Sequence, residues 1–155
     1  MAEYARQSQH HHAVRRLAER ICAGLQSKDY LSEILAVYYF VLAHTRYMND
    51  PRQIELVRAP WQVIAEIEAG RTPSLDCDDM ITLIAALLLA IGREVRIVTL
   101  AFRNMFFRGK RQYQHVVLQV REPRTGVWIL LDPVAAEDCD QMVQRVQAAK
   151  VWPVA

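Results

Sequence analysis

Three residues of the sequence, Cys77, His115 and Asp132, are of the types that catalysis by a thiol nucleophile requires. A cysteine thiolate attacks a carbonyl carbon, a histidine carries the proton to the leaving group, and a carboxylate fixes the orientation and tautomer of the imidazole. Residue types alone do not identify such a site, because free cysteine is among the most buried residues in proteins. The elements that carry the three side chains decide whether they can meet.

Cys77 lies in the first turn of a helix that the sequence predicts over residues 76–92. Asp76 is a favourable N-cap, and Gly92 can adopt the left-handed conformation that ends a helix. Almost every position between them is apolar, so we expect the helix to be buried on most sides. Free N–H groups and the positive end of the helix dipole would favour a thiolate at Cys77 and could hold an oxyanion. A neighbouring imidazolium would lower the pKa of the thiol further.

His115 and Asp132 fall on predicted strands that follow this helix. Runs rich in β-branched and aromatic residues predict antiparallel strands over 95–102, 113–121 and 127–131. Side chains alternate between the two faces of a strand, so His115 shares a face with Val117, and Asp132 shares one with Leu130. If the second and third strands pair, His115 and Asp132 can point the same way.

The remaining periodicity predicts helices over 12–26, 30–46, 60–70 and 136–150. The last of these would turn Met142, Val143 and Val146 inward. Helices followed by an antiparallel sheet of at least three strands predict an α+β fold. We expect residues 1–155 to form a single domain with its core at about 30–134, to which the helices 12–26 and 136–150 are additions.

Composition excludes several classes of function. A net charge of +2 over 155 residues is too small to indicate nucleic-acid binding. The three cysteines form no CxxC pair, which argues against a disulfide scaffold and a zinc site. We expect Asp78 and Asp79 to stabilise a helix start rather than bind metal. The apolar run 81–91 is too short to span a bilayer, and no signal peptide is recognisable. The expectation is therefore a cytoplasmic protein without cofactor, metal or membrane segment.

The segment 103–112 combines Met105, Phe106 and Phe107 with Arg108 and further positive charges. It carries no acidic residue. Two interpretations stay open: a flexible hairpin tip, or a docking loop for another protein, because exposed methionine and phenylalanine in a basic frame are typical of interfaces.

Several segments resemble the transglutaminase-like superfamily, which has a papain-like fold. The run Leu75-Asp76-Cys77-Asp78-Asp79 is similar to its nucleophile segment. Gln114-His115-Val116-Val117 is similar to its histidine strand, and Trp128-Ile129-Leu130-Leu131-Asp132-Pro133 to its aspartate strand. The upstream Arg46-Tyr47-Met48-Asn49-Asp50-Pro51 resembles its helix-to-loop segment. A side chain at Leu75, where many members have glycine, would crowd the acyl pocket if it pointed there.

The resemblance implies a catalytic triad of Cys77, His115 and Asp132 that acts on amide bonds of a protein or peptide, by hydrolysis, deamidation or acyl transfer. The resemblance extends to small members of the superfamily that are carried by bacteriophages and prophages. The alternative is therefore a non-catalytic structural or assembly component of a phage particle, which would be virion-associated, and which keeps the fold as a scaffold.

Overall fold

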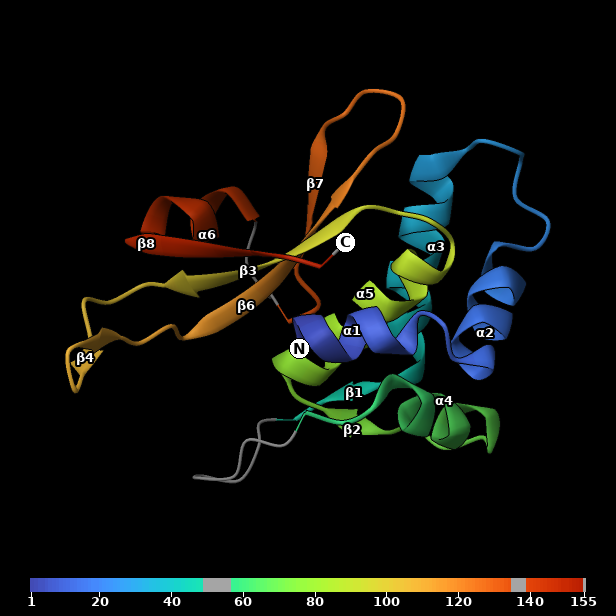
Figure 1. Ribbon diagram of the computed structural model, residues 1–155, viewed down its shortest axis with the longest axis horizontal. Coiled ribbons are helices and arrows are strands. Elements are labelled where there is room, and N and C mark those ends of the chain that lie inside the picture. The colour runs from blue at the N-terminus through green and yellow to red at the C-terminus, as the bar shows by residue number, and fades with distance from the viewer. Residues whose placement is uncertain (49–56, 135–138, 155) are drawn as a thin grey trace.

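A group of helices packs against an antiparallel sheet in the computed structural model, which describes residues 1–48, 57–134 and 139–154 (Figure 1). The helices are α1 (Ala2–Ser8), α2 (His12–Cys22), α3 (Tyr30–His44), α4 (Pro60–Glu68), α5 (Cys77–Ala90) and α6 (Cys139–Arg145). The strands are β1 (Arg46–Tyr47), β2 (Ser74–Leu75), β3 (Val95–Ala101), β4 (Phe106–Phe107), β5 (Lys110–Arg111), β6 (His115–Arg121), β7 (Trp128–Leu131) and β8 (Ala148–Pro153). This arrangement confirms the predicted α+β fold class.

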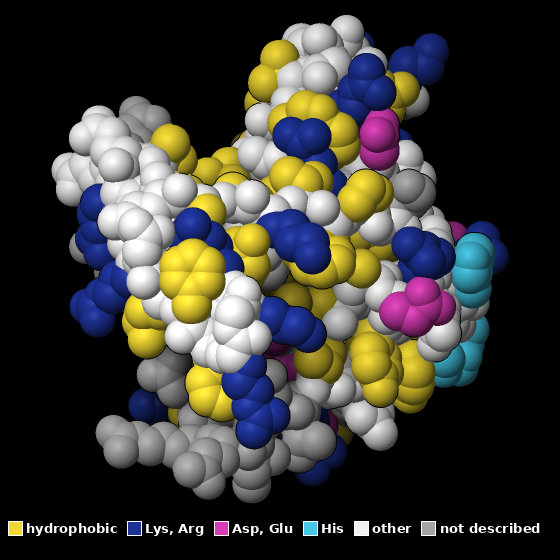
Figure 2. Space-filling model, turned by 60° about the vertical axis from the view of Figure 1, so that its left-hand side comes forward, with side chains coloured by type: hydrophobic (Ala, Val, Ile, Leu, Met, Phe, Trp, Pro, Cys, Tyr) yellow, Lys and Arg dark blue, Asp and Glu magenta, His cyan; other side chains and the backbone are white. Residues whose placement is uncertain are grey.

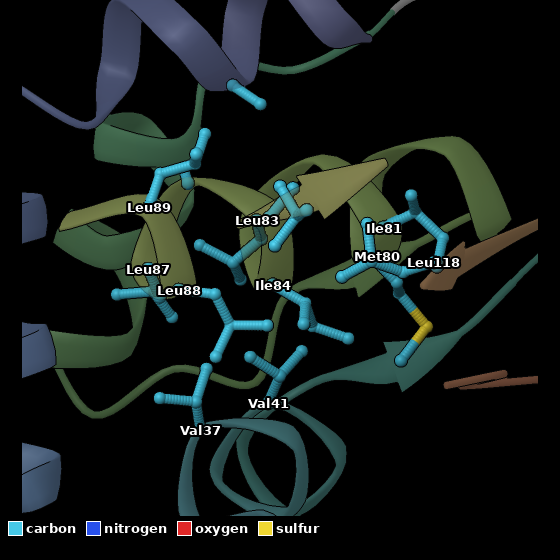
Figure 3. Close-up of a cluster of buried hydrophobic side chains, with 14 of the residues drawn as sticks. Val37, Val41, Met80, Ile81, Leu83, Ile84, Leu87, Leu88, Leu89 and Leu118 are labelled. Carbon is cyan, nitrogen blue, oxygen red and sulfur yellow. The ribbon is translucent and has the colours of Figure 1, made fainter. Parts of the chain in front are cut away.

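The helix α5 is the centre of the main core. Its residues from Asp79 to Leu89 are all buried. Helices α1 to α4 and the strands β3 and β6 all contact it. In Figure 3 the aliphatic side chains of α5 pack against Val37 and Val41 of α3, and Leu118 of β6 lies beside the start of the helix. A helix that is apolar all round is stable in a soluble domain only when it is covered in this way.

The ends of α5 are fixed as predicted. A carboxylate oxygen of Asp76 accepts the backbone N–H of Asp79 at 2.9 Å. At the other end Gly92 has a φ of +76°, and its N–H donates to the carbonyl of Leu89, while the N–H of Arg93 donates to that of Leu88. These paired bonds satisfy the last carbonyls of the helix and turn the chain toward β3.

The four-stranded sheet has the order β7-β6-β3-β8, with every neighbouring pair antiparallel. Alternation gives it two different faces. Val116 and Leu118 belong to the main core around α5, whereas Val117 and Val98 form a second, smaller cluster with Met142 of α6. His115 precedes Val116 and thus begins β6 on the side of the second cluster.

The predicted C-terminal helix is wrong over its second half. Helix α6 ends at Arg145, and Ala148–Pro153 forms β8 instead. This strand pairs with β3 from Arg96 opposite Pro153 to Ala101 opposite Ala148. The backbone groups at the edge of β3 gain partners in this way, and that tertiary pairing outweighs the helix propensity of the alanines and lysine in the segment. Of the residues expected to face inward, Met142 is buried but Val143 is 55% exposed.

Smaller differences concern the N-terminal half. Helix α1 was not predicted, and the helix expected over 12–26 ends at Cys22. Asn49, Asp50 and Pro51, from the segment that resembles the helix-to-loop segment of the superfamily, lie outside the described residues. Within the described part of the chain, no helix is both long and apolar enough to cross a bilayer.

Candidate active site

Cys77 is the first residue of α5 and follows directly from β2 and the cap Asp76. Strand β2 is held in place by β1, since the N–H of Met48 donates to the carbonyl of Leu75 and the N–H of Arg46 to that of Pro73, both at 2.9 Å. Leu75 is 1% exposed and belongs to the main core. Its side chain therefore anchors the approach to Cys77 and adds no surface to a pocket beside it.

His115 and Asp132 are in contact, as their predicted alternation allows. His115 is the first residue of β6, and Asp132 directly follows β7. Nε2 of His115 lies 2.6 Å from Oδ2 of Asp132. The histidine side chain is 16% exposed and the carboxylate side chain is fully buried. With Nε2 engaged, Nδ1 is the ring nitrogen that can exchange a proton with a thiol.

Asp132 is held at both its carboxylate and its backbone. Its Oδ1 accepts the N–H of Val134 at 3.0 Å, and its carbonyl oxygen accepts the hydroxyl of Tyr38 at 2.8 Å. Tyr38 comes from α3, so a helix of the main core fixes the end of β7. A buried carboxylate needs such partners, and a carboxylate fixed in position can in turn orient the imidazole ring.

The environment of Cys77 differs from the expectation. Its thiol donates to Oδ1 of Asp78 at 3.6 Å, and among the hydrogen bonds of the described residues it has none to His115. Burial, followed by the negative charges of Asp78 and Asp76, raises the pKa of Cys77 to about 12. The predicted lowering of this pKa is therefore wrong for this state, because burial disfavours the thiolate and the carboxylates that suit a helix N-terminus add to that effect.

Tyr47 is a neighbour of the site that the sequence did not single out as a functional residue. It lies in β1 and pairs with Leu75 of β2, which is two residues before Cys77. Burial raises the pKa of Tyr47, and the thiol of Cys77, when it is ionised, and the carboxylates of Asp76 and Asp132 raise it further. The phenol therefore lies near both the thiol and the carboxylate. The one signal in the sequence is its place in the segment that leads from the helix 30–46 into a loop.

No metal site accompanies these residues in the described part of the chain, where His, Cys, Asp and Glu side chains form no group of three that could hold an ion. Asp79 is buried, and its Oδ1 accepts the backbone N–H of Arg58 at 2.6 Å. Its role is therefore structural. The side chain of Cys139 lies outside the part of the protein that the structure describes.

Solved structures share this fold. A candidate protease from Parabacteroides distasonis superimposes with a TM-score of 0.63 at 10% identity, over 88% of this chain and 26% of its own. A candidate cysteine protease from Cytophaga hutchinsonii gives 0.59 at 16% identity, over 90% of this chain and 46% of its own. LapG of Legionella pneumophila, treated with EGTA, gives 0.57 at 17% identity, over 90% and 83% respectively. The chain thus spans less than half of the first two proteins.

At the level of sequence, the match is to a family and not to a single protein. No curated protein matches the chain. The family model of the transglutaminase-like superfamily, however, matches residues 15–133. That range includes the helix that begins with Cys77, the strand that begins with His115 and the residue Asp132. Since the matched range covers most of the chain and the solved structures share its architecture, the chain belongs to the transglutaminase-like superfamily.

Proposed function

We propose that the protein is a thiol-dependent enzyme that acts on amide bonds of peptides or proteins, by hydrolysis or by acyl transfer to an amine. The hydrogen bond between His115 and the buried carboxylate of Asp132 carries this proposal. A histidine held by a carboxylate, in a chain whose core helix begins with cysteine, supplies the three groups that thiol catalysis needs. Membership of the superfamily supports the proposal.

The reaction begins with the thiol of Cys77 as a neutral group. Sγ turns from Asp78 toward Nδ1 of His115, gives its proton to that nitrogen and forms a bond to the carbonyl carbon of the substrate. Backbone N–H groups at the start of α5 hold the oxyanion. The carbon–nitrogen bond then breaks, and His115 returns the proton to the leaving amine. Water or a second amine attacks the thioester and restores the thiol.

The raised pKa of Cys77 decides how the first step proceeds. A thiol with a pKa of about 12 is almost fully protonated at neutral pH. A preformed thiolate–imidazolium pair is therefore not the resting state, and proton transfer accompanies substrate binding and attack. The role of Asp132 is to keep the imidazole oriented for that transfer.

The same pKa is the observation that favours the alternative, a scaffold that keeps the fold without catalysis. A structural component of a phage particle would be one such scaffold. In that case Cys77 would be a buried thiol with a local hydrogen bond and no further role.

An activity comparison separates the two. Full-length protein is incubated with casein, with and without a fluorescent primary amine. New amino termini report hydrolysis of peptide bonds, and incorporated fluorophore reports acyl transfer. Released ammonia shows that a side-chain amide has been attacked, in either reaction. We expect wild-type activity to be abolished in Cys77→Ala and reduced about 10²-fold in Asp132→Ala, because the imidazole loses the group that orients it. Cys22→Ala is the matched control and should keep full activity. Activity that survives Cys77→Ala would reject the proposal.

A further inference from the structure

The hairpin formed by β4 and β5 extends the strands of the candidate site beyond the body of the protein (Figure 1). It joins the end of β3 to the start of β6, so His115 lies at its base. Gln114 fastens that base: its N–H donates to the carbonyl of Leu100 at 2.9 Å, and its side-chain oxygen accepts the N–H of Phe102 at 2.9 Å. The hairpin is therefore continuous with the strand that carries the histidine.

The hairpin has a defined turn that displays its apolar residues. Phe106 pairs with Arg111 and Phe107 with Lys110. Arg108 and Gly109 both have positive φ, at 48° and 75°, which is the turn type that suits the twist of a two-residue hairpin. The side chains of Met105, Phe106 and Phe107 remain 50–62% exposed. Such a contiguous apolar tip is unusual for a surface that contacts only water.

Positive charge surrounds these apolar residues. The segment 103–112 contains four Lys and Arg residues and no acid. The guanidinium of Arg111 lies 4.9 Å from the ring centre of Phe106, and that of Arg108 lies 5.4 Å from that of Phe107. The face turned forward in Figure 2 carries many Lys and Arg side chains among hydrophobic ones and few acidic ones. The complementary ligand is therefore both acidic and apolar.

Size and position indicate what kind of ligand this is. A stable interface between folded proteins needs roughly 800 Å² from each partner, which a hairpin with strands of two residues cannot supply alone. A short contact is effective when the same molecule is also held nearby, because the second contact then acts at a high local concentration. A polypeptide fits better than a lipid bilayer, because the hairpin joins β3 to the strand that begins with His115 and a polypeptide could contact both.

We propose that the hairpin 103–112 is a docking site for the substrate, and that it binds an acidic stretch with apolar side chains in the polypeptide whose amide bond reaches Cys77. The link to the amide rests on the proposed function, whereas the binding itself does not. Arg108, Lys110 and Arg111 contact the carboxylates, and Phe106 and Phe107 contact the apolar side chains.

The test measures binding to full-length Cys77→Ala, which cannot turn over a substrate. The probe is a fluorescein-labelled peptide that alternates Glu with Leu and Phe, and the comparison peptide has Lys in place of each Glu. We expect the acidic peptide to bind more tightly and to weaken as salt is added. Phe107→Ser and Lys110→Glu should each weaken it about fivefold or more, as for central residues of an interface.

Matched controls are Tyr39→Ser on α3 and Arg15→Glu on α2, which change exposed residues away from the hairpin. Thermal unfolding verifies that every variant is folded. Equal binding of both peptides, or equal losses in the control variants, would overturn the proposal. Binding to phosphatidylglycerol vesicles but not to the acidic peptide would also overturn it, in favour of a lipid surface. If the acidic peptide binds but the wild-type protein shows no activity on amides, only the proposed function would be rejected, and the docking proposal would stand.

Discussion

Asp78 has two opposing effects at the start of α5. A carboxylate in the first turn of a helix stabilises it by about 0.3–1 kcal/mol through the helix dipole. The same carboxylate accepts a hydrogen bond from the thiol of Cys77 and helps to raise the pKa of that thiol. At the scale of single residues, helix stability and nucleophile activation therefore compete for one position. We infer that Asp78 adds to the larger effect of burial in keeping Cys77 protonated.

Replacing Asp78 tests this inference. Asp78→Asn removes a negative charge beside the sulfur, so the pKa of Cys77 should fall, although burial continues to raise it. We expect iodoacetamide to alkylate Cys77 faster in the variant at about pH 8, where an ordinary cysteine begins to ionise. Mass spectrometry of the tryptic peptides measures the rate, and Cys22 in the same protein is the internal control. An unchanged rate at Cys77 would mean that Asp78 has no such effect.

Among the secondary-structure elements, α5 could be predicted closely and β8 could not. The limits of α5 are encoded locally, by the cap Asp76 and by Gly92 with its positive φ. The pairing of His115 with Asp132 also followed from strand alternation. In contrast, β8 depends on an edge of β3 about 50 residues earlier in the chain, for example on Thr99 opposite Lys150. Local propensity cannot report such a distant partner.

The buried position of α5 predicts a large effect of a single truncation. Leu88 is fully buried in the main core, so Leu88→Ala should lower the free energy of unfolding by about 2–5 kcal/mol. Leu31→Ala is the matched control on α3, because Leu31 is 47% exposed and its truncation leaves no cavity. Urea unfolding followed by circular dichroism measures both. A similar loss in the two variants would contradict the central position of α5.

At the scale of the whole molecule, the candidate site draws on three separate segments of the chain, and the fold brings His115 and Asp132 into contact. Cys77 begins the core helix, His115 begins a strand on the side of the second cluster, and Asp132 is anchored to α3 through Tyr38. The electrostatic surroundings of Cys77 could not be predicted from the sequence, because they depend on how deeply the fold buries the thiol. That burial also links the site to global stability.

The link predicts how stability changes at alkaline pH. The unfolded chain releases the proton of Cys77 near its ordinary pKa of about 8.5, whereas the folded protein keeps it up to about 12. Above about pH 8.5 the unfolded state binds fewer protons than the folded one, so the free energy of unfolding falls as pH rises. Below about pH 8.5 the thiol is protonated in both states, so it does not lower the free energy of unfolding there. Burial also raises the pKa of Cys22 and Tyr47, which act in the same direction.

Cys77→Ser isolates the part that comes from this thiol. Serine does not titrate in this range, so the variant should lose less stability than the wild type between about pH 8.5 and the folded pKa of about 12. Urea unfolding at a series of pH values measures the difference, which should be constant below pH 8.5. Curves that stay parallel at every pH would mean that the thiol is not protonated in the folded protein beyond its ordinary range. An advantage of the wild type over Cys77→Ser that grows as pH rises toward about 8.5 would indicate a lowered pKa, and a resting thiolate would then replace the neutral thiol in the first step of the reaction.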